Sequence, residues 1–118
     1  MKVLKVTELL GTPVLLAPEK GGELASHIKN SLGFFSPSVE VDFNGYQFLS
    51  SAFLNHAFSQ ICIDEDWDLQ KFSKKVTVKG LDEDDQDDLA LALDNAQLRR
   101  KLLKEGISVE DFFSKIPA

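Results

Sequence analysis

The segment between Val39 and Cys62 constrains the fold of this chain more than any other part of the sequence. It begins with an alternation of apolar and polar residues over Val39–Phe43, which is the pattern of a strand that buries one face. The dipeptide Asn44-Gly45 follows, and both residue types readily adopt the left-handed backbone of a tight turn. A helical pattern comes next, so the sequence predicts a strand, a turn and a helix in succession.

The predicted helix of this segment begins at a pair of serines. Ser50 and Ser51 are good N-cap residues, because a serine hydroxyl can accept a hydrogen bond from a free N–H of the first turn. The helical spacing predicts a broad buried face made of Phe53, Leu54, Ala57, Phe58, Ile61 and Cys62. The same spacing predicts that the side chains facing water are Asn55, His56, Ser59 and Gln60.

Strands and helices alternate over most of the remaining chain. We expect further strands over residues 2–6, 12–17 and 75–79, where apolar runs or alternations occur. We expect further helices over residues 24–32, 89–103 and 108–116, where apolar residues recur at helical spacing or follow a capping sequence. The prediction is an α/β fold with about four strands in a mixed sheet and helices packed on it. At 118 residues the chain suits a single domain over 1–118, with a short C-terminal helical extension at 107–118.

Composition bears on the partners of the chain. Nineteen acidic residues against thirteen basic ones give a net charge of −6, which repels phosphate backbones, so we expect no nucleic-acid binding. No run approaches the roughly 18 apolar residues of a membrane span, so we expect no membrane insertion and a cytoplasmic location. Cys62 is the only cysteine and lies between two isoleucines, which predicts a small core residue and not a reactive thiol.

The acidic residues concentrate in two stretches, and neither has the sequence of a metal site. Asp64, Asp66 and Asp68 have the spacing that opens a calcium-binding EF-hand loop. The glycine and glutamate that this loop requires are replaced by Leu69 and Lys75, so the calcium interpretation fails. The second stretch, 82–88, lies where the long helix should begin, and acidic side chains there stabilise a helix through its dipole.

The sequence contains no recognisable catalytic or cofactor-binding motif. His27 and His56 are the only histidines, and no Gly-x-Ser-x-Gly elbow occurs. The pair Gly21-Gly22 lacks the lysine and the serine or threonine that complete a phosphate-binding loop. We therefore predict a protein that is not an enzyme, needs no cofactor or metal, and acts by contact with another molecule.

Two short motifs in the central segment resemble those of a known family. Asp42-Phe43-Asn44-Gly45 ends the predicted strand, and Ala52-Phe53-Leu54-Asn55 opens the predicted helix. The combination resembles the STAS-like domain family of unknown function (DUF4325), over roughly residues 12–100. That family is similar to the STAS domains of anti-sigma-factor antagonists. The resemblance implies a sheet with helices on one side and a role in bacterial signalling.

In those antagonists, a regulatory serine lies at the start of the helix that follows the central strand. A serine kinase of the GHKL ATPase type phosphorylates it, and the added charge releases the partner. The resemblance thus implies a non-enzymatic regulatory protein that binds a protein partner such as a GHKL-type ATPase, with Ser51, or else Ser50, as the phosphorylation site. The partner-binding surface that it implies comprises Ser50, Ser51, Asn55, His56 and Ser59.

A second hypothesis uses the acidic stretches. An antitoxin-like or decoy protein would cover a basic surface of its partner with the residues of 64–68 and 82–88. Such binding would weaken steeply with salt, whereas a STAS-type interface would depend mainly on Ser51 and its neighbours. The sequence leaves the oligomeric state open.

Overall fold

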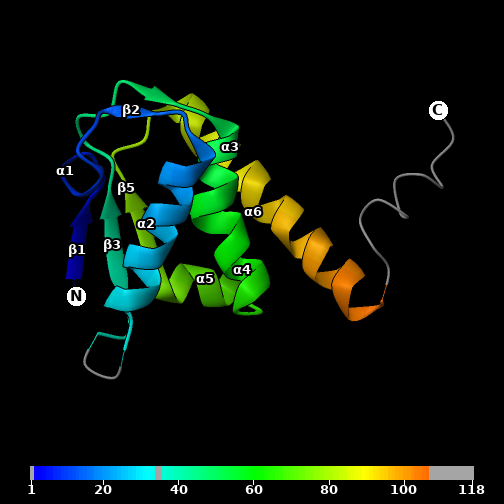
Figure 1. Ribbon diagram of the computed structural model, residues 1–118. Coiled ribbons are helices and arrows are strands. Elements are labelled where there is room, and N and C mark those ends of the chain that lie inside the picture. Colours follow the sequence, from blue (N-terminus) through cyan, green and yellow to red (C-terminus); the bar gives the residue numbers. More distant parts are fainter. Residues whose placement is uncertain (1, 34–35, 107–118) are drawn as a thin grey trace, which may run out of the picture.

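The computed structural model describes residues 2–33 and 36–106 of the chain. Its centre is a three-stranded sheet of β1 (Lys2–Lys5), β3 (Val39–Asp42) and β5 (Val76–Lys79). All three strands run parallel, with β3 in the middle (Figure 1). Parallel neighbours cannot be joined by a short hairpin, so each connection leaves the sheet and carries helices.

A second, smaller sheet lies at one end of the molecule. It consists of β2 (Val14–Leu15) and β4 (Phe48–Leu49), which also pair in parallel. In this pairing Val14 lies opposite Phe48, and Leu15 lies opposite Leu49. The described part of the structure therefore has one sheet of three parallel strands and a separate sheet of two parallel strands.

The prediction of one four-stranded mixed sheet is wrong, because the strand expected over 12–17 forms β2 of the separate small sheet and all the pairings are parallel. The N–H of Tyr46 donates to the carbonyl of Phe43 at 3.1 Å, and Gly45 has the left-handed φ of 92° that such a turn needs. The turn thus forms as predicted. The chain after it does not pair back onto β3, however, because β4 runs beside β2 instead.

The helices connect the strands and continue beyond the last one. They are α1 (Val6–Leu10), α2 (Pro18–Ser31), α3 (Ser51–Leu54), α4 (Gln60–Asp64), α5 (Leu69–Lys75) and α6 (Glu83–Lys104). A π-helical segment, η1 (Asn55–Ser59), joins α3 to α4, so these three segments form one helix over 51–64. That helix packs against α2 on one side and α6 on the other (Figure 1).

The predicted helices and the structure agree for the long elements and differ for the short ones. The helices expected over 24–32 and 89–103 are present; α2 begins several residues earlier, whereas α6 begins in the acidic stretch 82–88, as expected. The short helices α1 and α5 were not predicted. The helix expected over 108–116, with Phe112 and Phe113, lies outside the described residues.

The helices cover one face of the three-stranded sheet. Leu4, Val39, Val41 and Val76 point to that face and are buried. The opposite face carries partly or fully exposed side chains, namely Val3, Lys5, Glu40, Asp42, Thr77 and Lys79. This one-sided arrangement is the one that the resemblance implied.

The centre of the core is aromatic. Phe43, Phe53 and Phe58 are completely buried, and the ring of Phe43 lies 6.3 Å from that of Phe53 and 6.1 Å from that of Phe58. Cys62 is also completely buried, as predicted, and its burial raises the pKa of the thiol to about 11. The thiol therefore stays protonated at neutral pH, which makes it a packing residue. None of the helices in the part of the chain that the structure describes has the length and apolar character of a membrane span.

Candidate protein-binding site

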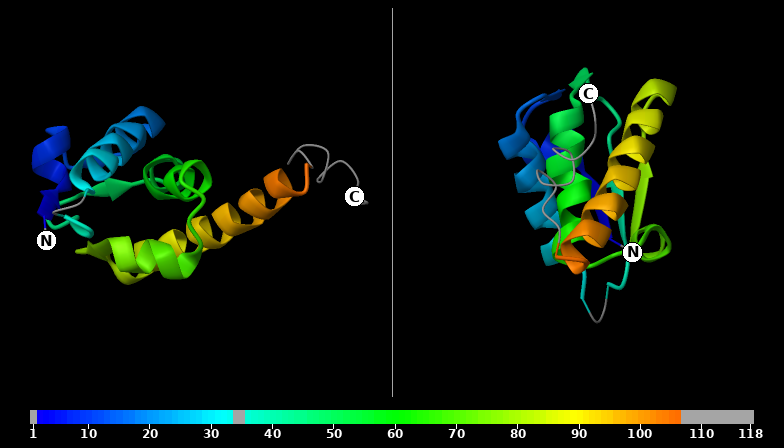
Figure 2. Two further views of the ribbon diagram at one scale, coloured as in Figure 1. Left: turned by 90° about the horizontal axis from the view of Figure 1, so that it is seen from below. Right: turned by 90° about the vertical axis from the view of Figure 1, so that its right-hand side faces the viewer.

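The two-stranded sheet brings the starts of two helices to the same end of the molecule. β2 leads directly into α2, β4 leads directly into α3, and the two helices lie side by side (Figures 1 and 2). Gly21 allows this close approach, because a Cβ at position 21 would overlap with the carbonyl oxygen of Phe53. The same Cβ would lie 3.0 Å from the Cβ of His56. The first turns of α2 and α3 therefore form one surface.

Ser50 is the N-cap of α3, as the sequence predicted. Its Oγ accepts a hydrogen bond from the N–H of Phe53 at 3.0 Å and donates one to the carbonyl of Leu16 at 2.8 Å. The hydroxyl thus satisfies a free N–H of the helix and ties the helix start to the chain after β2. Both hydrogen bonds are structural, so the Ser50 hydroxyl is already occupied.

Ser51 is the first residue of α3 and is exposed to solvent. Its hydroxyl makes no hydrogen bond within the described part of the chain, in contrast to that of Ser50. Ser51 is therefore the accessible hydroxyl of the pair. A phosphate attached there would lie beside the free N–H groups of a helix N-terminus, an environment that stabilises negative charge.

The remaining predicted site residues separate along this helix. His56 is exposed, and its Nδ1 lies 3.0 Å from the carbonyl oxygen of Ala52, which leaves Nε2 facing away from this contact. Asn55 is half-buried. Ser59 was predicted to face water, and that prediction is wrong: Ser59 is 4% exposed, and its Oγ donates to the carbonyl of Ala92 on α6 at 2.8 Å.

The packing of the helix over 51–64 between α2 and α6 is the physical reason for the burial of Ser59. Within η1 the consecutive residues Ala57, Phe58 and Ser59 are all buried. The residues after η1 keep the predicted pattern, since Gln60 is exposed and Ile61 and Cys62 are buried. A second neighbouring helix therefore widens the buried face beyond the single stripe that the helical spacing predicts.

Three exposed apolar side chains lie next to the start of α3. Phe48 is 60% exposed, Leu16 48% and Val14 39%. Val14 and Phe48 are cross-strand neighbours, and Leu16 is bound through its carbonyl to Ser50. The sequence pattern does not identify these residues, because a short apolar run has the same pattern whether its side chains are buried or exposed. We call the set Val14, Leu16, Phe48, Ser51 and His56 the helix-start surface.

Tyr46 fixes the turn between β3 and β4 to the start of α6. Its hydroxyl donates to Oδ2 of Asp85 at 2.6 Å and accepts from the N–H of Asp82 at 3.0 Å. Asp82 is in turn the N-cap of α6, since its side chain accepts from the N–H of Asp85 at 2.8 Å. Burial of the phenol, together with these two carboxylates, raises the pKa of Tyr46 to about 12.

We expect Tyr46→Phe to lower the free energy of unfolding by about 2 kcal/mol, because it removes a hydrogen bond to a charged carboxylate. In the wild type, the folded-state pKa of about 12 lies above the ordinary 10.0. The contribution of this shift is complete below pH 10.0 and is lost as the pH rises toward 12. Urea unfolding of the wild type and of Tyr46→Phe at neutral and alkaline pH measures the difference between their free energies of unfolding. Since Tyr46 is the only tyrosine, a difference that stays constant with pH would contradict the assignment of the raised pKa to its hydroxyl.

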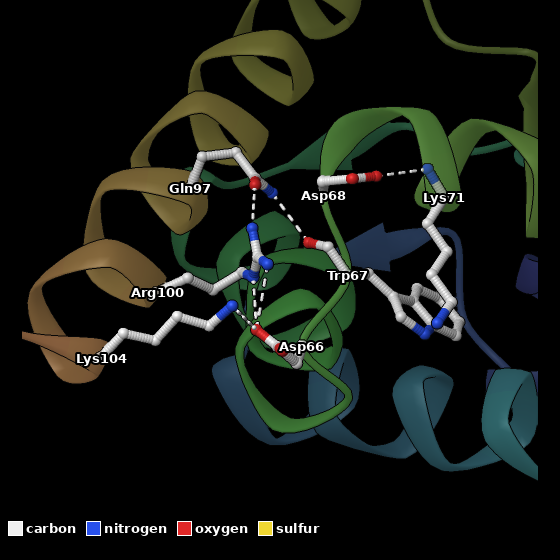
Figure 3. A network of polar contacts seen from close by, with 7 residues as sticks. All are labelled: Asp66, Trp67, Asp68, Lys71, Gln97, Arg100 and Lys104. Carbon is white, nitrogen blue, oxygen red and sulfur yellow. Dashed lines mark hydrogen bonds and ion pairs between the residues drawn. The ribbon is translucent and has the colours of Figure 1, made fainter.

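The first acidic stretch is held by basic residues of the same chain. Oδ1 of Asp66 accepts from Nε and Nη2 of Arg100, both at 3.0 Å, and lies 3.1 Å from Nζ of Lys104 (Figure 3). Hydrogen bonds from Lys104 and Arg100 lower the pKa of this carboxyl. The neighbouring carbonyl of Trp67 accepts from Gln97 at 3.0 Å. These contacts attach the 65–68 turn to the second half of α6.

The second acidic stretch forms the start of α6, as predicted. Asp82 caps the helix, and Glu83, Asp84 and Asp85 occupy its first turn, where the helix dipole favours negative charge. Within residues 2–33 and 36–106, no group of three or more side chains is arranged to hold a metal ion.

Comparison with known proteins supports the resemblance found in the central segment. No curated protein and no solved structure matches the chain significantly. One protein family does match, and it is described as the STAS-like domain of unknown function, DUF4325. The match covers residues 20–86, which include most of α2, all of β3 and β5, both motifs of the central segment, and Phe48, Ser51 and His56 of the helix-start surface. The chain therefore belongs to the family of STAS-like domains of unknown function.

Proposed function

We propose that this protein is a cytoplasmic regulatory domain that acts by binding another protein through the helix-start surface. The observation that carries the proposal is the grouping of Val14, Leu16 and Phe48, all exposed, beside Ser51, which is exposed as well. Exposed apolar side chains that gather at one place are typical of protein interaction sites. The similarity of the family to antagonist STAS domains favours a GHKL-type ATPase as the partner.

Phosphorylation of Ser51 is the switch that we propose for this interaction. A phosphoserine carries about −1.5 to −2 charges at neutral pH and is strongly hydrated. At the helix start it would be tolerated by the fold, because the free N–H groups of α3 favour an anion. Inside an interface with Phe48 and Leu16 it would have to be desolvated, which opposes partner binding. Ser50 is the less suitable site, because phosphorylation would remove the proton that its hydroxyl donates to the carbonyl of Leu16.

We expect Ser51→Asp to weaken partner binding at least about tenfold, which corresponds to about 1.4 kcal/mol. Ser51→Ala should bind as the wild type does, since the hydroxyl makes no hydrogen bond within the described residues. Tagged forms of both variants serve as baits in the native cells, with captured proteins and phosphosites identified by mass spectrometry. Affinities for the purified partner then follow from calorimetry.

A matched control is Ser73→Asp, which places the same charge on an exposed position of α5. Helix α5 lies at the opposite end of the molecule from the two-stranded sheet (Figure 1). This variant should retain full affinity, and circular dichroism should show all the variants folded. Equal affinities of Ser51→Asp and Ser73→Asp for the partner would refute the switch.

The acidic start of α6 supports a second candidate, the antitoxin-like or decoy protein. Glu83, Asp84, Asp87 and Asp88 are exposed and make no ion pair with any residue that the structure describes. The 64–68 stretch contributes less, because Asp64 and Asp66 are paired with Lys29, Arg100 and Lys104. Partner affinity that falls steeply with salt and is insensitive to Ser51→Asp would favour this candidate.

A further inference from the structure

The outward face of α6 has no partner within the described part of the chain. Ala92 and Ala96 are buried against the rest of the domain, with Leu89 and Leu93 packed beside them. Leu91 points the other way and is 59% exposed. Leu98, also outward, is 40% exposed and lies about two helical turns further along the same face. Leu102, one turn beyond, is buried, and Leu103, which is 58% exposed, lies about 120° around the helix from Leu91, so Leu91 and Leu98 are the exposed leucines of this face.

The charges of this face differ between its two halves. The residues before the leucine pair are acidic, and the exposed ones nearest to it are Asp87 and Asp88. The residues after it are basic, and the exposed ones nearest to it are Arg99 and Lys101. None of these four side chains makes an ion pair with a described residue, whereas Arg100 and Lys104, on the inner side, are bound to Asp66.

We propose that α6 forms an antiparallel helix pair with α6 of a second copy of this chain. In that arrangement the acidic half of each helix lies against the basic half of the other, and the helix dipoles also oppose each other. A parallel pair would place like charges together along its whole length. The partner that fits this face is a second copy of the chain, because the acidic half of one α6 matches the basic half of another α6 that runs in the opposite direction.

The positions along the helix are consistent with one two-fold axis. If Leu91 lies opposite Leu98 of the second copy, the helices cross midway between these two residues. Helical rotation of about 100° per residue then places Asp88 and Arg99 on one side of the contact, and Asp87 and Lys101 on the other. Asp88 therefore faces Arg99 of the second copy, Asp87 faces Lys101 of the second copy, and the two-fold axis generates each of these ion pairs twice. Asp94 is the unfavourable position, because it lies near the two-fold axis and therefore faces Asp94 of the second copy.

The helix of 22 residues is about 33 Å long, and the rest of the domain lies on its inner side (Figure 2). A second copy would therefore bind on the outward side of α6. The contact is a single helix pair with two leucines from each chain, which is small among stable interfaces. We expect a weak dimer with a dissociation constant on the order of 10 µM, which weakens with salt.

Sedimentation velocity from about 1 to 500 µM tests the proposal on the full chain. The wild type should change from monomer to dimer over this range. Leu91→Lys should raise the dissociation constant at least about tenfold, whereas Leu69→Lys, at an exposed leucine of α5, should leave it unchanged. Asp94→Asn should tighten the dimer. A wild type that stays monomeric throughout, or a dimer indifferent to Leu91→Lys, would overturn the proposal.

Charge exchange provides a test with an internal rescue. One variant carries Asp87→Lys with Asp88→Lys, and the other carries Arg99→Asp with Lys101→Asp. Each variant alone should be monomeric, because all its facing charges have one sign, and an equimolar mixture should dimerise. Circular dichroism confirms that both are folded. A mixture that stays monomeric while the wild type dimerises would refute the assigned contacts.

Cysteine cross-linking determines the direction of the helices, and the buried Cys62 does not interfere. Asp88→Cys mixed with Arg99→Cys should form an intermolecular disulfide under mild oxidation, because the two positions face each other in the antiparallel pair. Asp88→Cys alone should not form one. A disulfide-linked homodimer of Asp88→Cys would show a parallel pair and overturn the antiparallel arrangement.

Discussion

Replacing Gly21 by alanine is expected to destabilise the fold by about 2–3 kcal/mol, although alanine is the better helix former by about 1 kcal/mol. The added methyl group would overlap with the carbonyl oxygen of Phe53 and lie 3.2 Å from the backbone nitrogen of Ala57. Both are backbone atoms of the helix over 51–64, so no side-chain rotation relieves the contact. Helices α2 and α3 would have to separate, which also disturbs the helix-start surface.

Gly22 provides the matched control for this substitution. It lies next to Gly21 in the same helix, but a Cβ at position 22 would have no atom within 4 Å. Gly22→Ala should therefore stabilise the protein by about 0.5–1 kcal/mol through helix propensity alone. Urea unfolding of the two variants at one pH makes the comparison. Shifts of the same sign would show that helix propensity, and not the packing of α2 on α3, decides the outcome.

The parts of the fold that local sequence determines were predicted well. The strand β3 follows from the alternation over 39–43, because a period of two appears within five residues. The cap at Ser50 follows from a hydrogen bond that spans only three residues. The acidic start of α6 likewise depends on the adjacent helix dipole. In each case the interaction that fixes the structure lies inside the pattern that predicts it.

The parts that depend on distant residues were not predicted. β4 has two residues, and its pairing with β2 joins positions 34 residues apart, so nothing in the Asn44-Gly45 turn identifies the partner strand. Helix α5 has seven residues and one buried side chain, Phe72, which is too little for a helical period to appear. Ser59 is buried because α6 packs on this side of the helix over 51–64, where the carbonyl of Ala92 accepts its hydrogen bond.

The candidate site was predicted in part for the same reason. Ser50, Ser51 and His56 lie where the helical pattern placed them, since α3 begins at its predicted cap. The apolar part of the site, including Phe48, depends on which face of the small sheet is left uncovered. Which face is uncovered depends on the packing of the whole domain, and a phenylalanine in a short strand does not by itself indicate whether its side chain is buried or exposed.

Replacing Phe58 by alanine is expected to lower the free energy of unfolding by about 3–5 kcal/mol. The side chain is completely buried, and its ring lies 6.1 Å from that of Phe43 and 5.9 Å from that of Phe72. Its removal leaves a cavity between the sheet, the π-helical segment and α5, and the surrounding backbone can relax only partly. Because small domains have only about 5–15 kcal/mol of stability, thermal and urea unfolding should both show a large shift.

Phe48→Ala removes the same atoms from the helix-start surface and should give the opposite combination of results. Phe48 is 60% exposed, so its loss should cost less than about 1 kcal/mol of stability. If the proposed function is correct, it should nevertheless weaken partner binding more than any substitution on α5, because an exposed aromatic side chain is a typical hot spot. The natural counterpart of Phe48 is then a pocket on the partner. A Phe48→Ala variant that is as stable as the wild type and binds the partner with unchanged affinity would remove the apolar half of the proposed site.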